Sequence, residues 1–393
     1  MKRSILLVLV MLFVSVTGSC ATPTSVPPAA ATSPLPPTAT MPATAEAANL
    51  EITQEPVPFP LSELGPYWTG KRTFTFEDAS RDGRQIGITV FYPAVLPEGS
   101  KGPQLLAGTN RDPDLSSAPY PLIITGPDSA NYWFKTHLVS HGFVMAVVRY
   151  PGPIVDNLDL WVIDHPRDIL FVLDQIASCP PAGLEGIIDT GRVGVAGYSA
   201  ESVDAFAVSG VRVDPEFYLL RCKEAPAMEP ALPEMWELYV EITCNLAQMW
   251  DEFAARAGDS ITFDDDGLWQ PLTDERIRAV MATGPAWLYG ERGLAAVDRP
   301  ILIVCATEDE VVPYRIEPAY VFEHLGTPER FLISFVGQGH MMVFDPEQVK
   351  RMNHFAAAFF GTYLQGKSEY RNYFSEAFVS QFDDLAWGVY EGE

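Results

Sequence analysis

The chain has 393 residues, of which 47% are hydrophobic and 11% aromatic, enough for a sizeable buried core. Against 51 Asp and Glu it carries only 26 Lys and Arg, which gives a formal net charge of −25. This acidity argues against nucleic-acid binding, because the phosphate backbone is held by basic surfaces. It also disfavours docking of the folded domain on anionic lipid.

Residues 1–19 have the features of an export signal. Met1-Lys-Arg3 supplies the positive end, and the apolar run from Ile5 to Val16 is too short to span a membrane as a helix. The small residues Thr17-Gly-Ser19 then lead to Cys20. This order is similar to the lipobox of bacterial lipoproteins, in which the new N-terminal Cys carries lipid, although Thr17 stands where Leu is usual. An ordinary secreted protein with a chance Cys is the alternative.

Residues 20–56 are predicted to be a tether that begins at the lipidated Cys20. From Ala21 to about Ala48 the chain consists of Pro, Thr, Ala and Ser with almost no charge. Such a segment cannot bury enough apolar surface to offset the entropy of ordering it, so it stays extended. We therefore expect an exported protein that is lipid-anchored on the outer side of a bacterial membrane, with its globular domain in residues 57–393.

Strand-like and helix-like runs alternate through this domain. The expected strands are Arg72–Glu77, Gln85–Tyr92, Pro121–Thr125, Phe143–Val148, the run from Gly191 to Ser199, Ala279–Thr283, and the runs that begin at Pro300 and Phe331. The expected helices include Asp164–Ser178, with Pro166 in its first turn, a helix from Ser199 to about Ser209, and Pro346–Gln365. The first two strands are predicted to form a hairpin. The alternation favours an α/β fold, a mostly parallel eight-stranded sheet with helices on both faces.

Residues from about 213 to 273 interrupt this alternation. The segment is rich in Pro, Glu, Met and Trp, and we expect an inserted helical cap that shapes a substrate pocket. Cys222 and Cys244 flank one part of it and are the best candidates for a disulfide, which export permits. Cys305 lies in a buried strand pattern and is expected to be a free thiol. No Cys-x-x-Cys or His-Glu-x-x-His spacing occurs, so neither a metal site nor a cofactor is expected.

Three residues with complementary chemistry follow strand-like runs in the order Ser199, Asp309, His340. A serine hydroxyl needs a neutral imidazole to take its proton, and the imidazole needs a carboxylate to orient it. This chain order is that of α/β-hydrolases. Each residue has a plainer interpretation: an N-cap serine, a surface carboxylate with Glu308 serving instead, and a structural histidine.

The turn around the serine also predicts where the negative charge of a reaction intermediate would be held. The backbone N–H of Ala200 is one expected donor, and the loop after Pro121–Thr125 should supply the second, with Asp128 and Ser129 as candidates. Pro127 has no N–H to donate. Tyr198 and Glu201 flank this turn and are candidates for substrate binding, although Glu201 replaces the final Gly of the Gly-x-Ser-x-Gly pattern.

Several stretches together resemble one family. They are Arg81-Asp-Gly-Arg84 leading to Val90-Phe-Tyr-Pro93, Leu138-Val-Ser-His-Gly-Phe-Val144, Pro166-Arg-Asp-Ile-Leu-Phe-Val-Leu-Asp174, Ile188–Ser199 and Gly339-His340. Over most of residues 65–365, excluding the cap, the chain is similar to the bacterial platelet-activating-factor acetylhydrolase and dienelactone-hydrolase-like proteins. The resemblance implies a serine ester hydrolase of the α/β-hydrolase fold. Its expected substrates are short or truncated acyl esters, including phospholipid-derived ones, and it needs no metal.

Two departures from the family pattern fall beside the expected oxyanion site. The family commonly carries Ser-His-Gly where this chain has Gly126-Pro-Asp128, and a turn close to Gly-His-Ser-Phe-Gly-Gly where this chain has Gly197–Ser202. Loss of one oxyanion donor lowers rates by about 10²–10³. The alternative function is therefore a catalytically impaired lipoprotein of the same fold that binds a ligand or partner.

Overall fold

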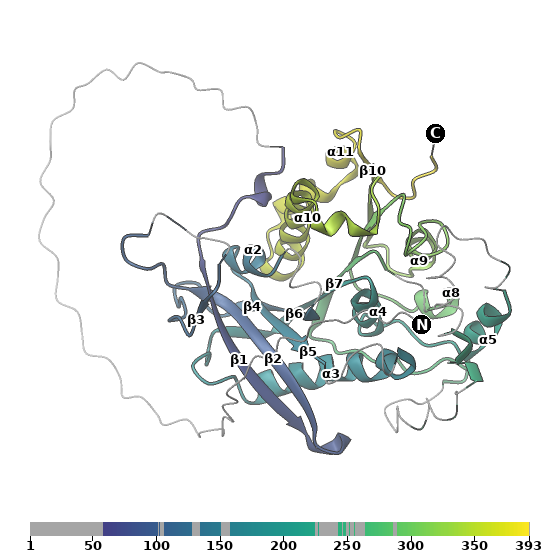
Figure 1. The fold of residues 1–393 in the computed structure, drawn as a ribbon, viewed down its shortest axis with the longest axis horizontal. Coiled ribbons are helices and arrows are strands. Elements are labelled where there is room, and N and C mark those ends of the chain that lie inside the picture. The colour runs from purple at the N-terminus through teal and green to yellow at the C-terminus, as the bar shows by residue number, and fades with distance from the viewer. Residues whose placement is uncertain are drawn as a thin grey trace, which may run out of the picture.

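The fold is taken from a computed structural model of the chain (Figure 1). It describes residues 58–100, 102, 106–127, 134–150, 158–224, 227, 243–245, 247, 248, 251, 255, 264–285 and 289–392. The predicted signal of residues 1–19, the predicted lipidation site Cys20 and the predicted tether of residues 20–56 lie outside the described residues.

A single sheet of ten strands forms the centre of the domain, in the order β10-β9-β8-β7-β6-β4-β5-β2-β1-β3 (Figure 1). The strands are β1 (Trp68–Asp78), β2 (Arg84–Ala94), β3 (Gly108–Thr109), β4 (Tyr120–Thr125), β5 (Val144–Arg149), β6 (Ile188–Tyr198), β7 (Ile277–Thr283), β8 (Ile301–Ala306), β9 (Arg330–Phe335) and β10 (Leu385–Trp387). The sequence predicted eight strands and missed the two edge strands, β3 and β10. β3 and β10 are only two and three residues long, too short to give a periodic signal.

The sheet is mostly parallel, as predicted. β5, β4, β6, β7, β8 and β9 run in the same direction, whereas β1, β2 and β5 pair antiparallel and β10 is antiparallel to β9. The carboxyl ends of the six parallel strands therefore meet at one edge of the sheet. Loops at that edge are where ligands bind in open α/β sheets.

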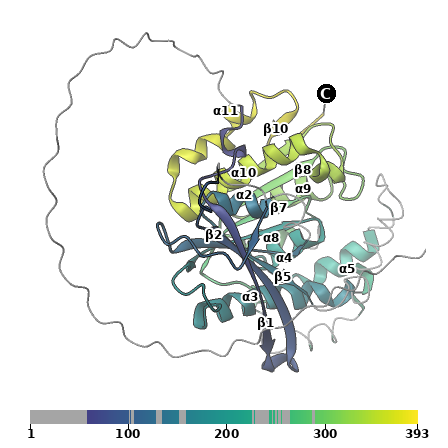
Figure 2. The same ribbon diagram turned by 60° about the vertical axis from the view of Figure 1, so that its left-hand side comes forward.

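Helices cover both faces of the sheet (Figure 2). They are α2 (Lys135–Ser140), α3 (Leu158–Ser178), α4 (Ala200–Ala207), α5 (Pro215–Glu224), α8 (Glu291–Leu294), α9 (Pro318–His324), α10 (Pro346–Gln365) and α11 (Glu376–Val379), with short 3-10 turns η1 (Pro60–Ser62), η2 (Ala79–Arg81), η7 (His340–Phe344) and η8 (Ser368–Phe374). The core beside α2 and α10 is separate from the core beside α3 and α4. Among the helices of the described residues, none combines the length and the apolarity needed to cross a bilayer.

The predicted start of α3 was six residues too late. The helix begins at Leu158, so Pro166 lies inside it and not in its first turn. A proline there removes one backbone hydrogen bond. Burial of Ile169 and Leu173 against the sheet offsets that loss and keeps the helix continuous.

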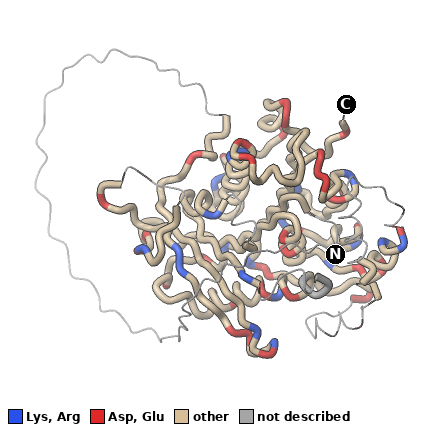
Figure 3. Tube along the Cα trace, in the orientation of Figure 1, with Lys and Arg blue, Asp and Glu red and all other residues tan. Residues whose placement is uncertain are grey.

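Ion pairs join the tip of the β1–β2 hairpin to α3. Acidic and basic positions both occur along the trace at this tip (Figure 3). Arg81 and Arg84 both pair with the buried carboxylate of Asp168, at 2.7 and 2.8 Å. Asp78 also pairs with Arg81, at 2.5 Å. The hairpin and α3 are thereby held together across one face of the sheet.

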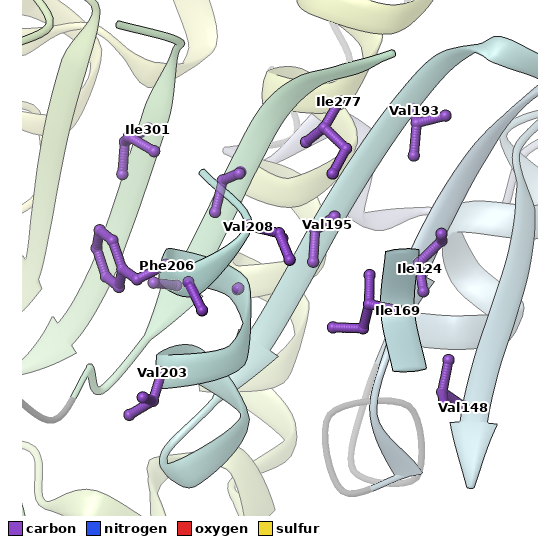
Figure 4. Close-up of a cluster of buried hydrophobic side chains, with 14 of the residues drawn as sticks. Ile124, Val148, Ile169, Val193, Val195, Val203, Phe206, Val208, Ile277 and Ile301 are labelled. Carbon is purple, nitrogen blue, oxygen red and sulfur yellow. The ribbon is translucent and has the colours of Figure 1, made fainter. Parts of the chain in front are cut away.

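Apolar side chains fill the space between the sheet and the helices α3 and α4 (Figure 4). Ile124 and Val195 come from neighbouring strands, while Ile169 comes from α3 and Phe206 from α4; each is at most 1% exposed. At about 25 cal/mol per Å² of buried apolar surface, this packing is the main force that holds α4 against β6 and β7. The turn between β6 and α4 is fixed in place as a result.

The segment of about residues 213–273, predicted to be an inserted helical cap, is described only in part. It contains α5 and an irregular stretch at 264–273, while most of the residues between them lie outside the described set. Cys222 and Cys244 form the predicted disulfide, with their Cα atoms 4.8 Å apart. Cys305 is a free, buried thiol, as predicted.

Candidate active site

Ser199 occupies the sharp turn where β6 ends and α4 begins. Its backbone has φ 53° and ψ −122°, a conformation that is unfavourable for a residue with a side chain. The turn is so tight that a Cβ on Gly197 would lie 2.0 Å from the backbone oxygen of Glu201, so this position requires glycine. Ser199 N–H donates to the carbonyl of Thr283 on β7 at 2.9 Å, which holds the turn at the sheet edge. The Ser199 side chain stays partly exposed.

His340 lies between Ser199 and Asp309. Its Nε2 is 3.0 Å from Ser199 Oγ, and its Nδ1 is 2.8 Å from Asp309 Oδ2. Both the imidazole and the carboxylate are buried, at 6% and 5% exposure. The structure therefore brings together the three side chains that the sequence singled out, across 141 and 31 residues of chain.

The carboxylate of Asp309 is held in one orientation. Its Oδ1 accepts hydrogen bonds from the backbone N–H groups of Val311 and Val312, at 2.9 and 2.7 Å, which leaves Oδ2 for His340. Glu308, the alternative acid, is exposed. A hydrogen bond from Nδ1–H to Asp309 leaves Nε2 unprotonated and able to accept a proton from Ser199.

The expected oxyanion donors are placed only in part. Ala200 is the first residue of α4 and lies directly beside Ser199, where helix N–H groups have no partner within the helix. Asp128 and Ser129 lie outside the described residues, which resume at Phe134. Gly126, at the end of β4, is described and buried.

Glu201 is buried at 3% exposure and packs against Gly126. A Cβ added to Gly126 would lie 2.2 Å from Glu201 Oε1 and 2.3 Å from its Cδ, so the glutamate fills space that only glycine leaves. The two departures from the family pattern are thus in contact. Reasoning from sequence found both residues but missed that one makes room for the other.

Tyr198 lies against His340, a contact that the sequence did not indicate. Its phenol donates to the backbone carbonyl of His340 at 2.9 Å, and its ring stacks on the imidazole with centroids 5.1 Å apart. The tyrosine is 6% exposed. The sequence proposed Tyr198 for substrate binding, whereas its described contacts are with the histidine turn.

Glu310 is a second contact to this turn that sequence reasoning missed. Its Oε2 accepts a hydrogen bond from the backbone N–H of His340 at 3.1 Å. The signal in the sequence is only its position, one residue after Asp309. Gly284 also lies at the site, since a Cβ there would be 3.6–3.7 Å from His340 and Asp309 in a backbone with φ +54°.

A cleft of about 650 Å³ lies beside the turn that carries Asp309. Thr307, Asp309 and Tyr314 line it together with residues of the C-terminal tail, Tyr390 and Glu391. Neither Ser199 nor His340 lines this cleft, so it is not where a bond attacked by Ser199 would lie.

The arrangement can generate a nucleophilic serine, with a buried imidazole as its base and an oriented carboxylate behind it. Within the described part of the chain, no group of three or more His, Cys, Asp or Glu side chains is placed to hold a metal ion. Comparison with known proteins found no family model that matches the chain and no significantly similar curated protein.

Proposed function

We propose that this chain is a serine carboxylic ester hydrolase of the α/β-hydrolase fold, acting on short or truncated acyl esters through an acyl-Ser199 intermediate. The observation that carries the proposal is the continuous contact from Ser199 Oγ to His340 Nε2 and from His340 Nδ1 to Asp309. Two features support the fold assignment: the nucleophile lies at a strand-to-helix turn, and acid and base follow it in the chain.

In the first half of the reaction, Ser199 Oγ attacks the ester carbonyl while His340 Nε2 takes its proton. Asp309 stabilises the imidazolium that forms. The N–H of Ala200, at the positive end of α4, donates a hydrogen bond to the carbonyl oxygen and stabilises its negative charge. Collapse of this intermediate breaks the ester bond, and the imidazolium gives its proton to the departing alcohol. Water, deprotonated by His340, then releases the acid from Ser199.

The location we propose for this enzyme is the outer side of a bacterial membrane, with lipidated Cys20 as anchor and residues 20–56 as tether. The small-residue run before Cys20 and the Pro/Thr/Ala-rich segment after it support this location. Phospholipid-derived esters with shortened acyl chains would be within reach of such an anchored domain.

The test compares hydrolysis of p-nitrophenyl acetate and butyrate by wild type and Ser199→Ala. We expect wild-type turnover that falls to the background rate in the variant, together with fluorophosphonate labelling of wild type only. A matched control is Ser178→Ala, at an exposed serine in the last turn of α3, which should keep the wild-type turnover. Equal rates from wild type and Ser199→Ala would overturn the proposal.

A second candidate function is a ligand-binding lipoprotein that has lost catalytic efficiency. The observation that favours it is the Glu201 carboxylate packed on Gly126, at the loop from which a second oxyanion donor would come. A folded wild type that resists the fluorophosphonate, yet binds an ester analogue, would select this function over the hydrolase.

A further inference from the structure

His340 has both of its backbone polar groups held by side chains from the other two turns of the site. Glu310 Oε2 accepts from His340 N–H at 3.1 Å, and Tyr198 Oη donates to His340 C=O at 2.9 Å. Tyr198 immediately precedes Ser199, and Glu310 immediately follows Asp309. The base is therefore connected to the nucleophile turn and the acid turn through its backbone as well as through its ring.

The segment before His340 is already joined to the turn that carries Asp309. Gly337 N–H donates to Thr307 Oγ1, and Glu308 N–H donates to the carbonyl of Gln338, each at 2.9 Å. Glu310 extends this connection to His340 itself. Gly337 is exposed with φ +71°, and Gly339 is the N-cap of η7 without a side-chain hydrogen bond. The first N–H groups of a helical turn have no partner inside the turn, so Glu310 satisfies a donor that would otherwise be free. A Cβ on Gly339 would lie 2.7 Å from Glu310 Oε2, which shows how closely the carboxylate approaches this backbone.

The ring of Tyr198 adds a second restraint. It stacks on the His340 imidazole with an interplanar angle of 26°, and the tyrosine itself is buried at the end of β6. Because β6 lies in the centre of the sheet, its last residue is a rigid support. The same side chain thus limits both the translation of the His340 backbone and the tilt of its ring.

We propose that Tyr198 and Glu310 are positioning residues that hold His340 Nε2 in reach of Ser199, so that the three turns act as one unit. The consequence for rate rests on the proposed hydrolase function. Misplacement of a catalytic group by about 1 Å lowers rates by as much as 10²-fold. Both side chains bind the backbone of His340, so their removal should act on the chemical step through the placement of the imidazole.

The kinetic test uses Tyr198→Phe, Glu310→Ala and Glu310→Gln. We expect kcat to fall about 10-fold in Tyr198→Phe and in Glu310→Ala, with KM unchanged, since each loses one hydrogen bond to the backbone of His340, buried for Tyr198 and partly buried for Glu310. Glu310→Gln keeps an acceptor oxygen and should recover most of the kcat. The exposed Glu308 gives a matched control, Glu308→Ala, in which kcat should stay within about two-fold of wild type.

Hydrogen exchange of the amides in residues 337–341 supplies a readout that needs no activity. Exchange should be faster in Tyr198→Phe and Glu310→Ala than in wild type, Glu310→Gln or Glu308→Ala, by more than at amides elsewhere in the same variant, which report any global loss of stability. Unchanged exchange and unchanged kcat in both loss variants would overturn the positioning role. If wild type and Ser199→Ala hydrolyse esters equally, the hydrolase proposal fails, while exchange still decides whether the two residues hold the turn.

Discussion

Arg84 forms a bidentate ion pair with Asp168, although 84 residues separate them in the chain. The guanidinium Nε and Nη2 lie 2.9 and 2.8 Å from the two carboxylate oxygens. Arg81 reaches the same carboxylate at 2.7 Å. These residues belong to two of the stretches that carry the family resemblance, and their contact gives both stretches a structural role in joining the first hairpin to α3.

Asp168→Ala is expected to be strongly destabilising. The aspartate is fully buried, and its removal leaves Arg81 and Arg84 partly buried without their shared counter-charge. Breaking one side of a buried ion pair lowers the free energy of unfolding by about 3–5 kcal/mol. Urea denaturation of wild type and variant measures the change, with the exposed Asp383→Ala as a control that should shift it by less than about 0.5 kcal/mol. A loss below about 1 kcal/mol would contradict the role assigned to this pair.

Acid should destabilise the fold through two buried histidines. Burial lowers the pKa of both His137 and His354 from the ordinary 6.5 to about 3. Between these values the unfolded chain binds two protons that the folded chain does not, so stability is full above pH 6.5 and falls as pH drops toward 3. The expected slope of unfolding free energy from the pair is about 2.7 kcal/mol per pH unit.

The same two histidines hold one backbone segment, which makes the variant test specific. Leu61 N–H donates to His354 Nδ1 at 3.1 Å, and Leu61 C=O lies 2.8 Å from His137 Nε2. His354→Asn offers an acceptor that does not titrate, so its stability curve should lose about half of the acid slope. Denaturation midpoints at intervals between pH 4 and 8 measure this; an identical slope in wild type and variant would refute the assignment.

A substitution at Glu201 should offset the loss of stability caused by a substitution at Gly126. Gly126→Ala would place a Cβ 2.2 Å from Glu201 Oε1, and overpacking of this kind lowers the free energy of unfolding by about 1–3 kcal/mol. Adding Glu201→Ala removes the collision and should restore most of the stability. A thermal-denaturation double-mutant cycle measures the coupling. Strictly additive effects would mean that the two side chains do not compete for the same space.

Replacing both Cys222 and Cys244 by serine should lower stability without altering the sheet. The bridge joins positions 22 residues apart, and closing a loop of this size contributes about 3 kcal/mol by restricting the unfolded chain. A guanidinium titration of the double variant beside wild type measures the loss. Cys305→Ser, at the buried free thiol, serves as a comparison that tests a core substitution without a bridge.

The strands of the sheet centre were predictable because each is a run of buried apolar residues, a pattern that short-range sequence carries. The run at Ile301–Ala306, buried at every position, is an example. The edge strands β3 and β10 were not predictable, since pairing with distant strands defines them and no periodicity does. The early start of α3 was missed because Pro166 indicates a helix start when neighbouring turns are unknown.

Within the candidate site, residue types and chain order were enough to single out Ser199, Asp309 and His340. The contacts of Tyr198 and Glu310 with His340 could not be predicted in this way. Each is a hydrogen bond to a backbone group of His340, and any residue type at position 340 would offer the same backbone groups. The packing of Glu201 on Gly126 likewise needs the approach of β4 to α4 in space. The candidate catalytic residues were thus predictable from residue type and chain order, whereas the contacts that hold them were seen only in the structure.

At position 199 the backbone conformation favours glycine for stability, whereas the proposed reaction requires serine. A residue with φ 53° and ψ −122° stores about 1–3 kcal/mol that glycine would not, so Ser199→Gly should make the protein more stable. A library screened for thermal stability alone would accumulate glycine there, whereas one screened for ester hydrolysis would keep serine. Glycine in the first population and serine in the second would show that serine is kept at this turn for the reaction and not for stability.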